Sequence, residues 1–501
     1  RHRSVSRGLG DVYKRQAGMV LFCEPEETGG TGESVSLTSC TVTGLEVKVK
    51  GAFDTGGGLV GQFGGSTALT VEDCSAKEIH FEADSLRWVF GLLGYADYTT
   101  SKDAKITVGN CLVSGVSFKA ESITTAGGFS LTGSHKNEAA FTFTDCHVED
   151  ASFECGTGEM GWVGGFTSGT NIRNTFESCT VDGVVFRKES SDSPCYQVGG
   201  FSGNTQNTLT EADKDEACKF DNCHVTGLDM QVAGPATHES AYSGAYLSIG
   251  GFIGTASQGW AAIENCSVTG TIDSPSYAGE IGGFIGGLGW NANQTISVKD
   301  CEANVNVTAG GDAGGFIGRS ADQSAEGQEG IAMTLIVEEC TATGSVTSLK
   351  GAAGGFVGAG DRGTYTGCTA EGTFVSGVKA GGFWGEIFPL KVSGKGLQVS
   401  ITGCEASNSV QGSTHAAGFL GYADTTDGSK TTSVTIKSSA ASPAVTGTAS
   451  TTEISCFLNM SDESSDTSNI NLGSEDSDED ANTSSITIAK PDDSNGKIEL
   501  D

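Results

Sequence analysis

Proline and positive charge are scarce in this chain of 501 residues. Only 7 Pro are present, and 29 Lys and Arg stand against 62 Asp and Glu, which gives a formal net charge of -33. So large an acidic excess disfavours nucleic acid and anionic membranes as partners, because phosphate-rich surfaces bind basic side chains. No apolar run approaches the roughly 20 residues of a membrane helix. We therefore expect neither nucleic-acid binding nor membrane insertion by this segment.

Motifs of metal and redox chemistry are missing as well. The sequence contains no His-Glu-x-x-His, which would place two zinc-binding imidazoles on one helical face, and no Cys-x-x-Cys. His147 and His224 both follow a repeated Cys but lie two repeats apart, too far for one metal ion to bridge. Acidic stretches such as 424–428 and the C-terminal region carry, at most, weak calcium binding. We expect no cofactor.

A two-part phrase recurs along the chain in place of such motifs. One half is a Cys with an apolar residue three positions before it and Val or Ala two positions after it. The other half is a Gly-Gly-Phe-x-Gly turn, as in 354–358. Spacings of 28 residues (Cys340 to Cys368) to 44 residues (Cys179 to Cys223) are typical of repeat arrays. The repeated Cys are Cys40, Cys74, Cys111, Cys146, Cys179, Cys223, Cys266, Cys301, Cys340, Cys368 and Cys404, with Ser439 in the twelfth place.

The spacing within each repeat predicts short strands joined at corners. Residues five and three before the Cys alternate as in a strand, the two residues between are turn formers, and Gly-Gly provides a tight bend. We therefore predict an all-β, parallel β-solenoid of about 12 turns, truncated at its N-terminus. A propeller is disfavoured, because two-residue hairpin turns are rare. The Phe of each turn forms an interior ladder: Phe129, Phe166, Phe201, Phe252, Phe284, Phe316, Phe356, Phe383 and Phe419.

Four segments follow from composition and spacing. Residues 1–16 are basic, and 4–16 resemble the translation of a sequencing-adapter remnant, although a genuine basic arm is the alternative. Residues 17–250 and 251–458 form two continuous sub-arrays. In the first, apolar residues lie five and seven positions after the repeated Cys, whereas in the second the apolar residue lies six positions after it. Residues 459–501 are acidic and are predicted to be a flexible, disordered tail. Long insertions include 189–196, 204–217, 233–246 and 319–330.

Two further cysteines, Cys155 and Cys195, lie outside the ladder register. Their place in outer loops of adjacent repeats makes them the best candidates for a disulfide, whereas packed free thiols are favoured for the ladder. A glycan-binding surface would show exposed aromatic side chains, and candidates such as Trp260, Trp290 and Tyr242 are few. Clustered carboxylates with a nearby base, as β-helix lyases and hydrolases require, are not evident.

The phrases Ala353-Gly-Gly-Phe-Val-Gly358 and Cys340-Thr-Ala-Thr-Gly-Ser-Val346 resemble the GLUG repeat of bacterial surface proteins. Gly57-Gly-Leu-Val-Gly61 comes closest to its Gly-Leu turn, and the likeness covers residue 17 to about 459. This resemblance implies a secreted or cell-surface bacterial protein, because such repeats occur, without catalytic role, in adhesins and IgA-specific metallopeptidases.

We accordingly expect a non-catalytic extracellular module, an adhesin or structural spacer that presents loops to a host protein, mucin or glycan. The alternatives are the stalk of a larger secreted enzyme and a solenoid polysaccharide lyase or hydrolase.

Overall fold

The computed structural model describes most of the chain between residues 34 and 448, together with short strands outside that span. The described ranges are 15–17, 34–63, 68–96, 105–130, 140–170, 173–190, 192–205, 217–234, 247–256, 261–288, 295–320, 334–388, 398–424, 433–437, 439–441, 444–448, 453–455, 458–460, 470–472, 483–484, 487–489 and 495–497.

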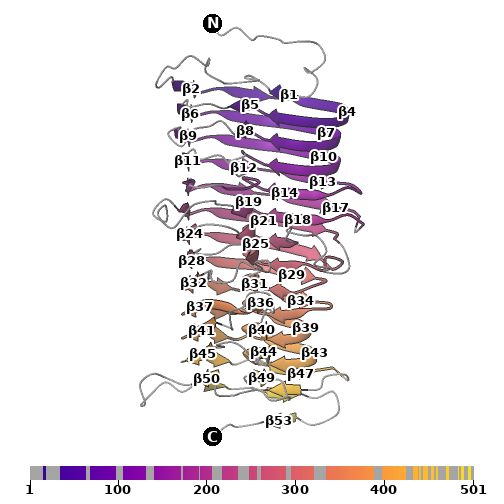
Figure 1. Cartoon of the computed structure of the whole chain (residues 1–501), viewed down its shortest axis with the longest axis vertical. Helices are drawn as coiled ribbons and strands as arrows, with labels where there is room; N and C mark the ends of the chain where they lie inside the picture. Colours follow the sequence, from indigo (N-terminus) through magenta and orange to yellow (C-terminus); the bar gives the residue numbers. More distant parts are fainter. Residues whose placement is uncertain are drawn as a thin grey trace, which may run out of the picture.

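The chain winds as a stack of coils along one long axis, with its first described strands at one end and its last at the other (Figure 1). Each coil passes through three sheets, which we name C, A and B in chain order. Neighbouring coils pair in parallel, in register except for shifts within four strand pairs, and among the described strands only β52 and β53 pair antiparallel. Every assigned element in the described residues is a strand. The predicted parallel β-solenoid is therefore confirmed.

Sheet C contributes one strand to each coil. Its thirteen strands are β2 (Ser34–Thr38), β6 (Ala68–Glu72), β9 (Lys105–Gly109), β11 (Ala140–Thr144), β15 (Thr175–Glu177), β20 (Cys218–Asp221), β24 (Ala261–Glu264), β28 (Thr295–Lys299), β32 (Thr334–Glu338), β37 (Arg362–Thr366), β41 (Gln398–Thr402), β45 (Ser433–Lys437) and β50 (Ile470–Leu472).

Sheet B follows each Gly-Gly-Phe turn. It begins with β5 (Val60–Phe63) and β8 (Leu93–Ala96), continues through isolated bridges at Ser130 and Thr167, and reaches eight further strands. These are β19 (Ser202–Thr205), β23 (Ile253–Ala256), β27 (Ile285–Leu288), β31 (Ile317–Ser320), β36 (Val357–Gly360), β40 (Trp384–Ile387), β44 (Leu420–Ala423) and β49 (Leu458–Met460).

Sheet A is the largest sheet, with thirty strands, because each coil crosses it in up to three short pieces. The strands are β1 (Arg15–Ala17), β3 (Thr41–Thr43), β4 (Glu46–Gly57), β7 (Ser75–Phe90), β10 (Leu112–Gly127), β12 (His147–Glu149), β13 (Ser152–Cys155), β14 (Met160–Gly164), β16 (Thr180–Asp182), β17 (Val185–Lys188), β18 (Cys195–Gly199), β21 (His224–Val232), β22 (Ser248–Gly250), β25 (Ser267–Ser274), β26 (Glu280–Gly282), β29 (Glu302–Ala309), β30 (Ala313–Gly314), β33 (Thr341–Ala342), β34 (Val346–Ser348), β35 (Ala352–Gly354), β38 (Thr369–Ala370), β39 (Phe374–Gly381), β42 (Glu405–Ala406), β43 (Ser409–Ala417), β46 (Ala440–Ala441), β47 (Ala444–Gly447), β48 (Glu453–Ser455), β51 (Thr483–Ser484), β52 (Thr487–Ala489) and β53 (Asn495–Lys497).

The corner between sheets C and A depends on the residue immediately before each ladder Cys. This residue adopts a left-handed conformation in coil after coil, with φ of 54° at Asp73, 49° at Asn110 and 51° at Asp145. Asn and Asp tolerate this region better than other non-glycine residues, which explains the turn formers seen in the sequence. Asn110 Nδ2 also donates to Asp73 Oδ1 at 2.6 Å, so adjacent corners are joined.

The ladder cysteines stand just inside this corner. Ten of them are buried, and Cys40 is partly exposed. Each ladder thiol donates a hydrogen bond to the backbone carbonyl oxygen two residues before it; Cys340 Sγ, for example, donates to the carbonyl oxygen of Glu338 at 3.1 Å. Contacts also run between coils, since the backbone N–H of Cys368 donates to Cys404 Sγ at 3.4 Å. The small thiol therefore serves both as core filler and as a link between coils.

The Gly-Gly-Phe turns place their Phe rings in one continuous interior stack. Neighbouring rings from Phe129 to Phe419 lie 4.6 to 5.0 Å apart, close to the spacing of hydrogen-bonded strands. The second glycine of each turn lies against the next coil: a Cβ added at Gly283 would meet the carbonyl oxygen of Gly315 at 2.0 Å. Only glycine fits there.

The change of spacing near residue 250 has a structural counterpart. β21 and β25 pair with a shift of one residue between Val225 and Leu228, where one residue is lost from the corner. Pairing nevertheless continues without a gap through β22 and β26. At the ends, β1 pairs with β4, and β50, β51 and β52 pair with the preceding coils. The rest of 1–16 and 459–501 lies outside the described residues, so the proposed arm or artefact and the flexible tail stay predictions.

Candidate binding sites

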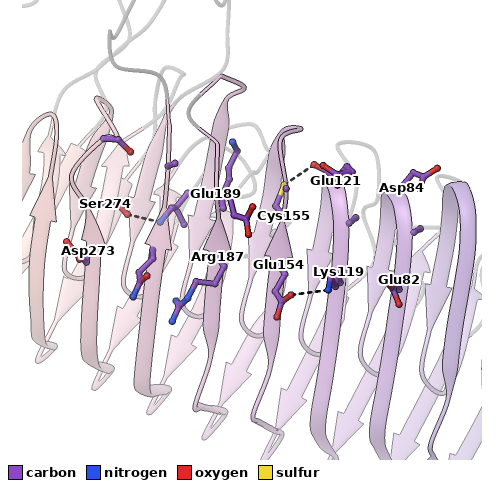
Figure 2. Close-up of a pocket in the computed structure, with 18 of the residues that line it drawn as sticks. Glu82, Asp84, Lys119, Glu121, Glu154, Cys155, Arg187, Glu189, Asp273 and Ser274 are labelled. Atoms are coloured by element: carbon purple, nitrogen blue, oxygen red, sulfur yellow. Dashed lines mark hydrogen bonds and ion pairs between the residues drawn. The ribbon is translucent and has the colours of Figure 1, made fainter.

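Sheet A carries a side groove on its outer surface. It has a volume of about 1050 Å³ and crosses seven successive coils, from β4 to β25 (Figure 2). Three parallel rows of side chains form it. The lining residues are Lys48, Val49, Lys50, Glu82, Ala83, Asp84, Lys119, Ala120, Glu121, Glu154, Cys155, Gly156, Arg187, Lys188, Glu189, Gln231, Val232, Ala233, Asp273, Ser274, Pro275 and Ser276.

The outer row of the side groove alternates in charge. Strand register places Lys48, Glu82, Lys119, Glu154 and Arg187 on consecutive coils. Lys48 Nζ lies 3.6 Å from Glu82 Oε2. Lys119 Nζ lies 4.0 Å from Glu154 Oε2 (Figure 2). These pairs are exposed, so each contributes little to stability. Their order nevertheless disfavours a slip by one coil, because a slip would place like charges opposite one another.

Charged residues of both signs line the side groove. Five basic residues line it (Lys48, Lys50, Lys119, Arg187, Lys188) against six acidic ones (Glu82, Asp84, Glu121, Glu154, Glu189, Asp273), a net of 5 - 6 = -1. The whole chain carries -33. Scaled to the same 22 residues, the chain average is -33 × 22/501, about -1.4, so the groove is not distinguished by its net charge. Its five basic side chains nevertheless offer individual contacts to an anionic partner.

The floor of the side groove is built of small or apolar side chains, with one buried cation among them. Lys188 is 3% exposed, and its Nζ donates to the carbonyl oxygen of Ser190 and, at 3.2 Å, to Ser193 Oγ. Burial lowers the pKa of Lys188. Beside it, burial raises the pKa of Cys155 to about 11 and raises that of Cys195 further. Both thiols are free in the structure, so the disulfide between them stays a prediction.

A second feature, which we call the seam, runs along the outside of the Gly-Gly-Phe turns where sheets A and B meet. Each coil contributes two residues to the seam. The first lies two positions before the Gly-Gly pair, or its equivalent, and the second lies seven positions after the first. Two such pairs touch directly: Lys379 forms an ion pair with Glu386, and the rings of His415 and Tyr422 lie 4.6 Å apart. The positions on sheet A, in coil order, are Thr55, Trp88, Thr125, Trp162, Gln197, Ser248, Glu280, Asp312, Ala352, Lys379 and His415.

Charges enter the seam in the later coils and are buried there. Glu280 is 1% exposed; its Oε2 accepts a hydrogen bond from Ser248 Oγ at 2.9 Å, and its Oε1 accepts one from Arg319 Nη1 at 3.1 Å. Gly287 lies across the turn, where an added Cβ would meet Ser248 Oγ at 2.6 Å and Glu280 Oε2 at 3.6 Å, so glycine leaves room for this hydrogen-bonded pair. Burial raises the pKa of Glu386, and Lys379 opposes this effect. Nearby Asp361 and Arg362 also form a buried ion pair at 2.9 Å.

Ion pairs buried in this way contribute little net stability, since removing both charges from water offsets most of their attraction. A solenoid held by Phe and Cys ladders does not require them. Their concentration at one stretch of the seam therefore marks a candidate site.

The predicted site residues fall in other places. The ladder Cys and Phe residues lie inside the coil, whereas His147 and His224 lie on an outer row. His147 and His224 flank Thr180 on the same row, two coils apart as expected, and their Nδ1 atoms contact the hydroxyls of Thr180 and Ser267 at 2.8 Å.

In the described part of the chain, no three His, Cys, Asp or Glu side chains are grouped as metal ligands would be. The expectation of weak calcium binding is untested, and residues 425–428 lie outside the described residues. No described helix has the length and apolarity to cross a membrane.

The proposed aromatic residues Trp260, Trp290 and Tyr242 also lie outside the described residues. Instead, the structure brings Trp88 and Trp162 into one seam row, both half-buried. Sequence reasoning missed them, although their common position two residues before the turn was the available signal.

Comparison with known protein families finds one match, over a short segment. The model described as the GLUG motif matches residues 245–273, which include the turn at 250–254 and the strand after Cys266. Searches of curated proteins and of solved structures found no match. The matched segment is one stretch of the repeat array, from just before β22 to β25, so the similarity to the GLUG motif is shown for that stretch of the solenoid.

Proposed function

We propose that the chain is a non-catalytic extracellular module of a bacterial surface or secreted protein, which acts as an adhesin or structural spacer. The observation that carries this proposal is the unbroken stack of nine Phe rings from Phe129 to Phe419. A continuous core of this kind makes a stiff rod, because each coil is held by its two neighbours. A rod of this kind holds its surface features at a fixed distance from its base.

Two surfaces are available for a partner. The connections from sheet B to sheet C take up most of the variation in repeat length, as between β31 and β32, and loops on one corner are where solenoids usually bind. The side groove follows the long axis over seven coils, so it suits an extended polymer such as a glycan or mucin chain better than a compact ligand.

The geometry favours binding over hydrolysis. A glycoside hydrolase requires two carboxylates of different protonation on either side of a bond. Glu280 and Asp312 occupy equivalent positions on consecutive coils, yet Glu280 is already engaged by Ser248 and Arg319. An enzyme stalk or a solenoid lyase or hydrolase therefore remains the alternative that an activity assay must exclude.

The test combines shape with binding. Small-angle X-ray scattering of the full chain should give an elongated rod, and the protein should be retained on immobilised mucin or on a glycan array. The double charge reversal Lys119→Glu with Arg187→Glu in the side groove should reduce retention. Lys299→Glu is the matched control, because Lys299 is similarly exposed but lies on sheet C.

If the groove double variant were retained as well as the Lys299→Glu control, the groove would be excluded as the contact. Retention of neither wild-type protein nor variants would leave only the spacer role. Release of reducing ends or unsaturated products from a polysaccharide panel would refute the non-catalytic assignment.

A further inference from the structure

The charged stretch of the seam contains a pocket of about 310 Å³, which we call the seam pocket. It lies between β26, β30 and β31 and the turn that follows β34, and its size is that of a small-ligand site. Five glycine or alanine residues and four charged side chains line it. The lining residues are Ala278, Gly279, Glu280, Gly310, Gly311, Asp312, Arg319, Lys350 and Gly351.

The backbone of the pocket wall is already satisfied. The N–H groups of Gly310 and Gly311 donate to the carbonyl oxygen of Tyr277 at 2.9 and 3.0 Å, and the N–H of Gly351 donates to Ser348 Oγ. A ligand would therefore be recognised by the four charged side chains, while the glycines let it approach closely.

The acids in the pocket have partners, and the bases are less completely engaged. Glu280 accepts from Ser248 and Arg319, and Asp312 Oδ1 accepts from the N–H of Ala352 at 3.0 Å. Arg319 Nη1 donates a hydrogen bond to Glu280, but the buried Nε of Arg319 has no hydrogen-bond partner among the described residues. Lys350 is exposed at the rim. The unused capacity of the pocket is thus mainly that of hydrogen-bond donors with positive charge.

The pocket wall also contains a group that can recognise hydroxyls on the ligand. Asp312 stands beside the two cations, and it can accept hydrogen bonds from hydroxyl groups through its second oxygen. A ligand with one carboxylate and several hydroxyls satisfies both sides, whereas phosphate or sulfate would add more negative charge beside Glu280 and Asp312.

We propose that the seam pocket binds the carboxylate-bearing ring of an acidic sugar. Its carboxylate lies between Arg319 and Lys350, and its hydroxyls donate to Asp312. This assignment deepens the proposed function, since it names the class of glycan unit that the rod recognises, and it depends on the glycan part of that proposal.

The experiment is ligand-observed NMR with the full chain, using sodium glucuronate, glucose and sodium acetate as probes. Glucuronate should bind more tightly than either of the others, because glucose lacks the carboxylate and acetate lacks the ring. Lys350→Gln should weaken glucuronate binding by about tenfold or more, through loss of a charge-assisted hydrogen bond. Lys350 is exposed, so this change should leave folding intact. Lys299→Gln is the control and should bind as wild type does.

Equal binding of glucose and glucuronate would overturn the proposal, as would acetate binding as tightly as glucuronate or an unaffected Lys350→Gln variant. The result can be separated from that for the proposed function. Retention on mucin without glucuronate binding would reject the seam pocket alone, whereas glucuronate binding without retention on any surface would reject the adhesin role alone.

Discussion

The Phe stack offers a quantitative test of what stabilises the solenoid. Phe316 has no exposed surface, and its ring lies 4.7 Å from that of Phe284 on one side and 4.7 Å from that of Phe356 on the other. Phe316→Ala removes a whole buried ring, for which about 3–5 kcal/mol is expected. Aromatic pairs contribute roughly 0.5–1.5 kcal/mol each beyond burial, and two pairs are lost here. We therefore expect Phe316→Ala to lower the free energy of unfolding by about 4–5 kcal/mol, the upper half of the range for loss of a buried ring.

A matched control comes from the chain itself. Leu59 and Leu92 occupy the equivalent position in the first coils, and the N–H of Leu59 donates to the carbonyl oxygen of Leu92 as its Phe counterparts do. Phe316→Leu retains most of the volume, so it should cost only about 1–2 kcal/mol.

The assay must resolve local from global unfolding, because a solenoid is stabilised coil by coil. Urea unfolding gives the free-energy change, and native-state hydrogen exchange locates it. Exchange should accelerate for the amides of Gly283 to Gly358, which flank Phe316, and much less near Phe129. A loss below about 1 kcal/mol for Phe316→Ala, or one equal to that for Phe316→Leu, would refute the view that stacked rings hold the coils together.

Three further predictions concern glycine, thiols and pH. Gly283→Ala should lower the free energy of unfolding by more than about 3 kcal/mol in urea, since its Cβ would lie 2.0 Å from a backbone oxygen of the next coil. Gly109→Ala, which has nothing within 4 Å, should be nearly neutral. In native protein at pH 8, mass spectrometry after alkylation should show Cys40 modified before Cys74, because Cys74 is buried and its pKa is raised to about 11; equal labelling would contradict a closed core. Burial raises the pKa of Glu386 above 4.5, so the native state binds its proton more tightly than the unfolded state. Stability from this group should therefore fall as pH rises from about 4.5 through the native pKa, and Glu386→Gln should flatten that dependence in urea titrations at several pH values.

The sequence reveals the interior of this fold better than its exterior. Every coil must place a small residue at the Cys corner and glycine where backbones meet, so those positions repeat visibly. Even the loss of one residue after Val225 was visible as a change in spacing. Asp300 and Glu339 take the left-handed corner position before the Cys, with φ of 51° at each.

The seam escaped detection because the fold does not restrict its chemistry. The same row holds Trp88, Thr125, Gln197, Glu280 and Lys379, which share no side-chain property. A pattern becomes visible only when a residue is compared with the one seven positions later, as for Lys379 with Glu386. No local rule of strand or turn formation predicts that two such positions face each other across a Gly-Gly-Phe bend.

That freedom is also the argument for placing function in the seam. Rows that stabilise the rod are uniform, because each member packs against an identical neighbour above and below. A row that varies from coil to coil contributes little to stacking, and its residues can be chosen for a partner instead. Buried charge strengthens the case, since Glu280 and Arg319 add little net stability where apolar residues would pack as well. If the seam serves a partner rather than stability, replacing Glu280 by Met and Arg319 by Leu together should leave the free energy of unfolding unchanged or higher. A solute that binds the wild-type pocket should no longer bind this double variant, although the variant still folds; a large loss of stability would instead show that the ion pair has a structural role.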